Sequence, residues 1–338
     1  MSKRKYKKIR WSNVIILFCI ITLGVIAGYK SIELFQAVQK EADGSGQWTN
    51  TPYPTQTIPL NATSEEAETG DELEGIDYLH SNNAILVRLE DQKVLFKKNS
   101  DEKLYPASLT KIMTALVAIE SLQDLNQEIV LSTSMFRKLY EEDASLAGFL
   151  PKEEVAAIDL IYGVLLPSGA ECCIGLADEI SGSEEAFTEL MNKKARELGM
   201  NNTNFTNATG LHDEDHYTTA EDLALLLEYA LENPTFRDVF TASRHSTPAT
   251  NLHSGGITYN STLFDKLKGY QLSHSKILGG KTGFTSEAGL CLASLAEIDG
   301  KEYIFVSADA AGDHSTEQYN ITDAVNIYES ITLTLGSE

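Results

Sequence analysis

Ser108 and Lys111 lie three residues apart in a stretch whose other side chains are mostly apolar, SLTKIMTALVAIESL. Residues with this spacing share one face of a helix, so the hydroxyl and the amine can point into the same cleft. A serine hydroxyl is a poor nucleophile at neutral pH and needs a neighbouring base, and a lysine can be that base if burial lowers its pKa. The pair indicates nucleophilic catalysis, although alone it is also typical of an N-cap serine followed by a solvated lysine.

Two further candidates occur later in the chain. Lys281 precedes Thr282 and Gly283 in an expected strand and follows two other glycines. Lysine and threonine can together bind a carboxylate, and the strand edge can pair with a peptide. Ser168 lies in the loop after the apolar run LIYGVLLP. Taken singly, these features are also typical of a glycine-rich turn with a surface lysine and of a turn that caps a helix.

Strands are expected at both ends of the folded region, with helices between them. The runs AILVRLE and VLFKKNS flank a polar turn and predict a hairpin that begins near Asn83. Three more strands are expected at 277–284, 289–298 and 301–310. Helices are expected at 108–122, 153–166, 171–181, 184–198, 219–232 and 314–333. Thr218 and Glu221 predict a capping box for the helix at 219. Because hairpins join its strands, the sheet should be mostly antiparallel, and the fold class is α/β.

The order and context of the three motifs make them far more specific than any one alone. Ser-x-x-Lys, a middle Ser-Asp-Asn and Lys-Thr-Gly form the signature of class A β-lactamases and penicillin-binding proteins. Residues 77–333 resemble the serine D-Ala-D-Ala carboxypeptidases of the low-molecular-weight penicillin-binding class. The resemblance is carried by YPASLTKIMT from Tyr105, LLPSG from Leu165, GLH from Gly210, HYTTAEDLA from His216 and GKTGFT from Gly280. It implies a penicillin-binding, β-lactamase-like fold with a mostly antiparallel sheet, flanking helices and a helical insert subdomain.

The resemblance also implies an activity and its catalytic groups. The chain would remove the terminal D-alanine from peptidoglycan stem pentapeptides, without a cofactor or metal, and β-lactams would acylate it. Ser108 would be the acylated nucleophile, Lys111 its base and Ser168 a proton relay. In the substrate-binding strand, Lys281 and Thr282 would hold the terminal carboxylate.

Within the same strand, Gly283 belongs to the implied substrate-binding motif. The backbone N–H groups of Ser108 and Phe284 would form the oxyanion hole.

The middle motif departs from the family pattern. Family members often have Asn at its third position, where this chain has Ala170 followed by Glu171. Because this amide is missing, the catalytic rate and the substrate preference stay open. The identity of the nucleophile does not depend on the amide. A β-lactamase is one alternative, although no clear Glu-x-x-x-Asn motif follows to supply a deacylating base. A non-catalytic module that senses the wall or the drug is another, and transpeptidation would differ only in whether an amine attacks the acyl-enzyme.

The charges are unevenly placed along the chain. Six of the 27 basic residues lie in the first ten positions, which leaves 21 basic against 49 acidic residues in the remainder. A surface that acidic repels phosphate backbones, which argues against a nucleic-acid partner. The uncharged run VIILFCIITLGVIAGY follows the basic cluster. The basic cluster and this run predict a cytoplasmic basic tail at 1–12 and a membrane anchor or signal segment at 13–32. The composition that follows predicts a flexible acidic linker at 33–76. The resemblance implies that 77–338 is the D,D-carboxypeptidase domain.

The anchored enzyme is thus expected on the outer face of the cell membrane, or secreted if the segment is cleaved. Cys172, Cys173 and Cys291 are interpreted as buried small hydrophobic residues, with a bridge from Cys172 or Cys173 to Cys291 left open. The cluster from His212 to His216 holds two histidines and three acids, but a surface loop is favoured over a metal site.

Overall fold

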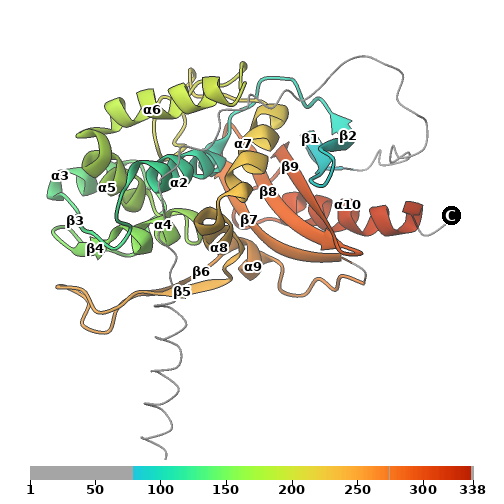
Figure 1. The fold of residues 1–338 in the computed structure, drawn as a ribbon. Helices are drawn as coiled ribbons and strands as arrows, with labels where there is room; N and C mark the ends of the chain where they lie inside the picture. Colours follow the sequence, from blue (N-terminus) through green and yellow to red (C-terminus); the bar gives the residue numbers. More distant parts are fainter. Residues whose placement is uncertain (1–78, 274, 336–338) are drawn as a thin grey trace, which may run out of the picture. The chain divides into compact units, whose positions relative to one another are not determined.

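The computed structural model describes residues 79–273 and 275–335, with side chains through residue 331. A five-stranded antiparallel sheet has the order β2-β1-β9-β8-β7, so the two ends of the domain meet in one sheet (Figure 1). Its strands are β1 (Ser81–Arg88), β2 (Lys93–Lys98), β7 (Ser275–Thr285), β8 (Gly289–Ile298) and β9 (Lys301–Ala310). β7 forms one edge of this sheet, and its outer side is not paired with another strand of the sheet.

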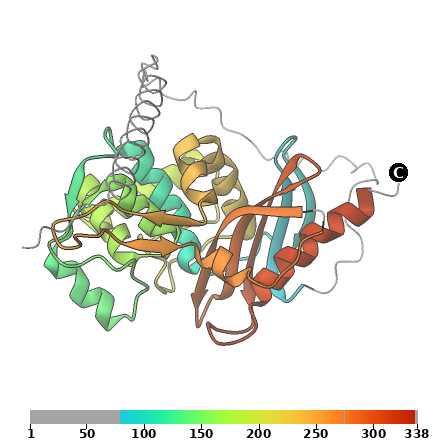
Figure 2. The same ribbon diagram turned by 90° about the horizontal axis from the view of Figure 1, so that it is seen from below.

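Both faces of the sheet are covered, which explains why β8 and β9 are almost continuously apolar. Alternate residues of a strand point to opposite faces. Ile85 and Val87 pack toward the helical region, whereas Leu86 and Phe305 pack with the helix α10 (Tyr319–Leu335). Figure 2 shows α10 lying along its own face of the sheet.

The helical region is built around α2 (Thr110–Ser121), which follows a short 3-10 helix, η1 (Ala107–Leu109). Ten of the twelve α2 residues are buried, as expected for a helix that is apolar on nearly every side. The helices around it are α3 (Thr133–Glu141), α4 (Ala157–Leu165), α5 (Ala170–Ser181), α6 (Glu184–Glu197), α7 (Ala220–Glu232) and α8 (Pro234–Thr241). The remaining elements are α9 (Thr262–Lys266) and two short hairpins, β3 (Glu128–Val130) with β4 (Glu154–Ala156) and β5 (Arg244–Ser246) with β6 (Thr258–Asn260).

The predicted terminal strands and the helices at 108–122, 171–181, 184–198 and 219–232 are confirmed, with small shifts of their ends. The helix expected at 153–166 is partly wrong, because 154–156 pair as β4 and the helix begins at Ala157. The final helix begins at Tyr319 rather than 314. The helices α3, α8 and α9 were not expected.

The predicted capping box at the start of α7 is wrong by one residue. Thr219 is the N-cap, and its hydroxyl accepts a hydrogen bond from the Asp222 N–H. Thr218 is hydrogen-bonded to Thr203, and Glu221 accepts from the Ser100 hydroxyl. Both expected residues are therefore used in tertiary contacts that sequence spacing does not reveal.

The predicted anchor cannot be compared with this structure. Among the described residues, no helix is long and apolar enough to cross a membrane. The segments 1–12, 13–32 and 33–76 lie outside the described residues, as does Cys19.

Candidate active site

Ser108 and Lys111 lie at the junction of η1 and α2, one helical turn apart. Lys111 Nζ donates a hydrogen bond to Ser108 Oγ at 3.1 Å and another to the carbonyl oxygen of Thr209. Ser108 is half-buried, whereas Lys111 is only 3% exposed. Burial lowers the pKa of Lys111, because removing an ammonium ion from water disfavours its charged form. The arrangement places the amine of Lys111, whose neutral form is favoured, beside a Ser108 hydroxyl that is accessible from solvent.

The backbone before the serine is held in an uncommon conformation. Ala107 has a φ of 46°, in the left-handed region that costs a residue with a Cβ about 1–2 kcal/mol. Two close backbone contacts surround this turn. A Cβ added to Gly210 would lie 1.9 Å from the Ala107 oxygen, and one added to Gly283 would lie 3.2 Å from the Ser108 nitrogen. Position 210 therefore requires glycine, whereas a Cβ at position 283 would need its neighbours to shift by a few tenths of an ångström.

Ser168 faces the same region from the turn between α4 and α5. It too is left-handed, with a φ of 70°. Lys281 Nζ, from β7, donates to Ser168 Oγ at 2.9 Å and to the Thr282 carbonyl at 2.7 Å. Burial lowers the pKa of Lys281 well below its ordinary value, and the charge of Lys111 acts in the same direction. The structure thus brings the second lysine and the middle serine into direct contact.

The rest of the β7 motif lies along the sheet edge. Thr282 Oγ1 is hydrogen-bonded to Thr262 Oγ1 at 2.7 Å. The Gly283 backbone passes beside the N–H of Ser108, as its close approach to the Ser108 nitrogen shows. Phe284 is half-buried, and its ring is 4.8 Å from that of His314. An extended peptide could add to this edge by strand pairing, with its acyl carbon near Ser108.

Glu171, the residue after the missing amide, does not project into the cleft. Its Oε1 accepts hydrogen bonds from the N–H groups of Ala147, Gly148 and Phe149 at 2.7, 2.9 and 3.3 Å. Its Oε2 is buried without a hydrogen-bond partner. Burial raises the pKa of this carboxyl. Glu171 thus holds the 147–149 loop against the turn that contains Ser168, a role that the sequence did not suggest.

The three described cysteines are free and buried, so the interpretation as small hydrophobic residues is confirmed and the bridge that was left open is not formed. Burial raises the pKa of Cys173 and of Cys291 to about 12, which keeps both thiols protonated. They belong to α5 and β8, and a protonated thiol is a poor nucleophile.

The histidines of the 212–216 segment do not converge on one point. His216 is 2% exposed and is hydrogen-bonded to Thr110 and Thr206, whereas the ring of His212 packs against Tyr105. The described residues contain no group of three or more His, Cys, Asp or Glu arranged to hold a metal ion. The segment instead forms part of the wall beneath η1, a function that its composition could not have indicated.

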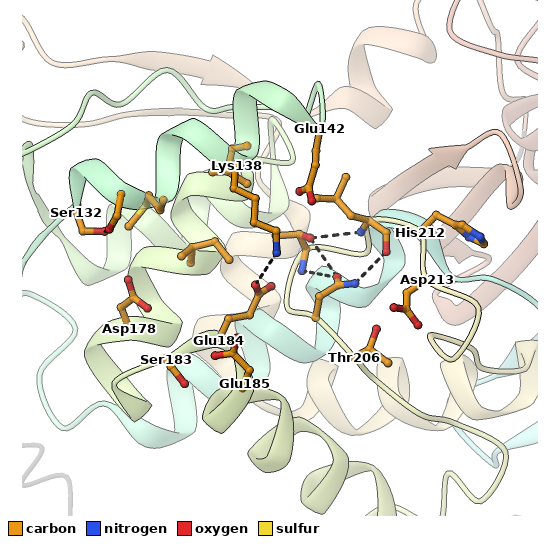
Figure 3. Close-up of a pocket in the computed structure, with 17 residues that line it drawn as sticks. Ser132, Lys138, Glu142, Asp178, Ser183, Glu184, Glu185, Thr206, His212 and Asp213 are labelled. Carbon is orange, nitrogen blue, oxygen red and sulfur yellow. Dashed lines mark hydrogen bonds and ion pairs between the residues drawn. The ribbon is translucent and has the colours of Figure 1, made fainter.

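A cavity of about 470 Å³ lies beside the 206–213 segment (Figure 3). Its lining is rich in acids, including Glu142, Asp178 and Glu184, and Lys138 lies 3.8 Å from Glu184. Ser108, Lys111, Ser168 and Lys281 do not line it. Thr209 lines the cavity and also accepts a hydrogen bond from Lys111, so the 206–213 segment separates the cavity from the candidate catalytic groups.

Comparisons with known proteins agree with this geometry. Residues 69–312 match the Peptidase S11 family model, described as D-alanyl-D-alanine carboxypeptidase. The chain is 36% identical over 221 residues to the D-alanyl-D-alanine carboxypeptidase DacF of Bacillus subtilis, covering 64% of this chain and 54% of that one. It is 30% identical over 266 residues to DacC of Escherichia coli, covering 73% and 62%. The chain thus spans between half and two thirds of the length of these two relatives.

A solved structure is similar to this chain, and the match covers nearly the whole length of that structure. The crystal structure of a DD-transpeptidase from Streptomyces matches with a TM-score of 0.68 and 25% identity, covering 76% of this chain and 98% of that one. The predicted penicillin-binding fold, with its antiparallel sheet and flanking helices, is thereby confirmed.

Proposed function

The chain belongs to the Peptidase S11 family of D-alanyl-D-alanine carboxypeptidases, and we propose that it removes the terminal D-alanine from peptidoglycan stem pentapeptides. The observation that carries the proposal is the pair of buried lysines, each donating a hydrogen bond to a serine of the same site. Burial of a lysine away from water lowers the stability of the folded state. A domain that only bound peptides would gain nothing from two buried lysines.

In the first step, Ser108 Oγ attacks the carbonyl carbon of the D-Ala-D-Ala bond and its proton passes to neutral Lys111. Burial favours the neutral amine, and the 3.1 Å hydrogen bond gives the proton a direct path. The N–H groups of Ser108 and Phe284 stabilise the oxyanion. The leaving D-alanine nitrogen then takes a proton through Lys111 and Ser168, which breaks the peptide bond and leaves an ester on Ser108.

Lys281 and Thr282 bind the terminal carboxylate of the substrate. Without substrate, burial and the neighbouring Lys111 disfavour the charge on Lys281. A carboxylate that enters the site raises the pKa of Lys281 again, because an opposite charge at short range favours the ammonium form. Gly283 has no side chain, so the peptide backbone can approach the β7 edge. This arrangement explains a preference for a free carboxyl terminus.

Water cleaves the ester in the second step, with the same groups acting in reverse. Glu171, the carboxylate next to the middle motif, has one oxygen engaged by three N–H groups of the 147–149 loop. We therefore expect slow hydrolysis of a penicilloyl ester, whose bound ring obstructs the approach of water. This expectation favours a penicillin-sensitive carboxypeptidase over a β-lactamase.

We also propose that the N-terminal segment attaches the enzyme to the outer face of the cell membrane. The support is in the sequence: a basic cluster within 1–12, an uncharged apolar run within 13–32 and an acidic, Pro- and Thr-containing linker at 33–76. Basic residues on the amino side keep that end in the cytoplasm, and the linker would hold residues 77–338 away from the bilayer. Fractionation with carbonate extraction tests it, and release of the full-length chain would contradict it.

The activity is tested by measuring the intact mass of the full-length protein in detergent after incubation with benzylpenicillin. We expect a persistent adduct of one penicilloyl group that maps to Ser108, absent from Ser108→Ala, and D-alanine release from a pentapeptide. Destruction of penicillin without an adduct would favour a β-lactamase. Intact penicillin without an adduct would favour a non-catalytic module.

A further inference from the structure

One of the two oxyanion donors, the Ser108 N–H, belongs to the peptide group that joins Ala107 to Ser108. Because a peptide bond is planar, the direction of the Ser108 N–H is set by the direction of the Ala107 carbonyl. Ala107 is left-handed, with a φ of 46°, so this peptide plane is turned away from the orientation that an ordinary helical start would give it. Whatever holds the Ala107 oxygen therefore aims the Ser108 N–H.

The Ala107 oxygen accepts two hydrogen bonds from Thr110, one from its backbone N–H and one from its buried hydroxyl. Thr110 Oγ1 donates to the Ala107 oxygen at 2.8 Å, and the same Thr110 oxygen lies 2.7 Å from His216 Nε2. Thr110 is fully buried and His216 is 2% exposed. Since the hydroxyl proton is given to Ala107, the bond between Thr110 and His216 requires the imidazole to be the donor.

The other ring nitrogen of His216 decides the tautomer. Nδ1 lies 3.0 Å from the backbone nitrogen of Thr206, whose N–H can only donate. Nδ1 must therefore accept, and the single proton of the neutral ring is on Nε2. Burial lowers the pKa of His216 to about 4, against the opposing effect of Asp213, while His212 and Lys111 act with burial. The ring is neutral under physiological conditions, as the two contacts require.

The three hydrogen bonds point in one direction, from the Thr206 N–H through the imidazole and the Thr110 hydroxyl to the Ala107 carbonyl. We propose that His216 is a positioning residue for acylation, which aims and polarises the Ala107–Ser108 peptide through Thr110 and so strengthens the Ser108 N–H as an oxyanion donor. Hydrogen bonds in such a chain polarise one another, and a more polarised carbonyl makes its own N–H a better donor. The inference rests on the proposed function, because it concerns the tetrahedral intermediate of that reaction.

Two substitutions at position 216 separate the two nitrogens of the ring. In His216→Gln the side-chain amide nitrogen can occupy the place of Nε2 and donate to Thr110, while the acceptor for Thr206 is lost. In His216→Asn the amide oxygen can occupy the place of Nδ1 and accept from Thr206, while the donor to Thr110 is lost. Thr110→Val removes the hydroxyl at nearly constant shape, and Thr110→Ser restores it.

The measurement is the second-order rate constant for acylation of the full-length protein by benzylpenicillin. It is normalised to the fraction of protein that can be acylated, so that loss of folded protein does not count. We expect His216→Asn and Thr110→Val to be acylated about tenfold more slowly than the wild type, since each weakens an oxyanion donor without removing it. His216→Gln and Thr110→Ser should remain within about threefold of the wild type.

A second readout isolates the oxyanion. A peptide boronic acid forms a tetrahedral adduct with the serine, and its affinity should fall by the same factor as the acylation rate, with the KM for the pentapeptide unchanged. Equal rates for His216→Asn and His216→Gln, or for Thr110→Val and Thr110→Ser, would overturn the relay. Absence of acylation in the wild type would instead refute the proposed function, so the two failures are distinguishable.

Discussion

The two lysine–serine pairs of the site have similar hydrogen bonds but different origins. Lys111 and Ser108 are three residues apart on one helical turn, whereas Lys281 and Ser168 are separated by 113 residues and come from a strand and an inter-helix turn. The surroundings also differ. Glu171 and Glu184 partly oppose the effect of burial on the pKa of Lys111, whereas Lys281 has Lys111 and Lys266 as cationic neighbours.

This difference indicates a division of labour. The first pair is assembled by local geometry, within one helical turn. The second exists only when the sheet and the helical region are packed together, so it can respond to the charge of an entering substrate. We therefore expect changes at the first pair to abolish the chemistry, and changes at the second to affect carboxylate recognition and proton transfer.

The largest effect is expected at the local pair, Ser108 and Lys111. Lys111→Ala should lower the rate of acylation about 10³-fold or more, because the nucleophile loses its base. Stopped-flow measurement with a chromogenic β-lactam checks this. Lys268→Ala, which truncates an exposed lysine, serves as the control and should acylate normally. A rate for Lys111→Ala within tenfold of the wild type would assign the base elsewhere and end the distinction between the two pairs.

The support beneath the local pair is tested by Gly210→Ala, which should lower the free energy of unfolding by about 3 kcal/mol. Its added Cβ would meet the Ala107 oxygen at 1.9 Å, and its φ is 80°. Gly199→Ala is a matched control, since Gly199 also has a φ of 80° but nothing within 4 Å of an added Cβ.

The two variants share the cost of a positive φ. The difference between their free energies of unfolding, measured by chemical denaturation, therefore reports the contact with the Ala107 oxygen alone. If both lose the same stability, the 206–213 segment does not support the turn before Ser108.

Substitutions in the distant pair, Ser168 and Lys281, should have a smaller effect on activity. Ser168→Ala removes the partner of Lys281 and the proposed relay, and we expect kcat to fall about 10²-fold with the pentapeptide. Lys281→Ala should act chiefly on KM, because it removes the carboxylate partner. Steady-state D-alanine release checks both. An equal effect of both variants on kcat alone would show that the distant pair has no separate role in recognition.

The smallest effect, on stability, is expected at Glu171, which holds the 147–149 loop against the turn that contains Ser168. Burial raises its pKa in the folded protein, so ionisation opposes folding as the pH rises from the ordinary Glu range through the raised value. Gln keeps the acceptor for the three N–H groups but cannot ionise. Glu171→Gln should therefore gain stability relative to the wild type as the pH rises, by about 1 kcal/mol at neutral pH.

Thermal unfolding at several pH values checks this, with the exposed Glu189→Gln as control. A stability difference that does not change with pH would mean that the pKa of Glu171 is the same in the folded and unfolded states, which would contradict the raised pKa.

The sequence by itself determined which candidate catalytic residues lie close together in the chain. Ser108 and Lys111 are brought together by the helical repeat, and the alternating and continuous apolar runs predict the strands that carry Lys281. The order of the three motifs then indicated the family and, with it, the fold. None of these inferences requires knowing which distant residues touch.

Only the tertiary structure decided the contacts that depend on packing. It placed Ser168 on Lys281, Glu171 on the 147–149 loop and His216 on Thr110, 106 residues away along the chain. It also replaced the expected Thr218 cap by Thr219 and left the three described cysteines free. A polar side chain that leaves water must find a partner, but many partners are available in sequence, and the packed backbone alone selects among them.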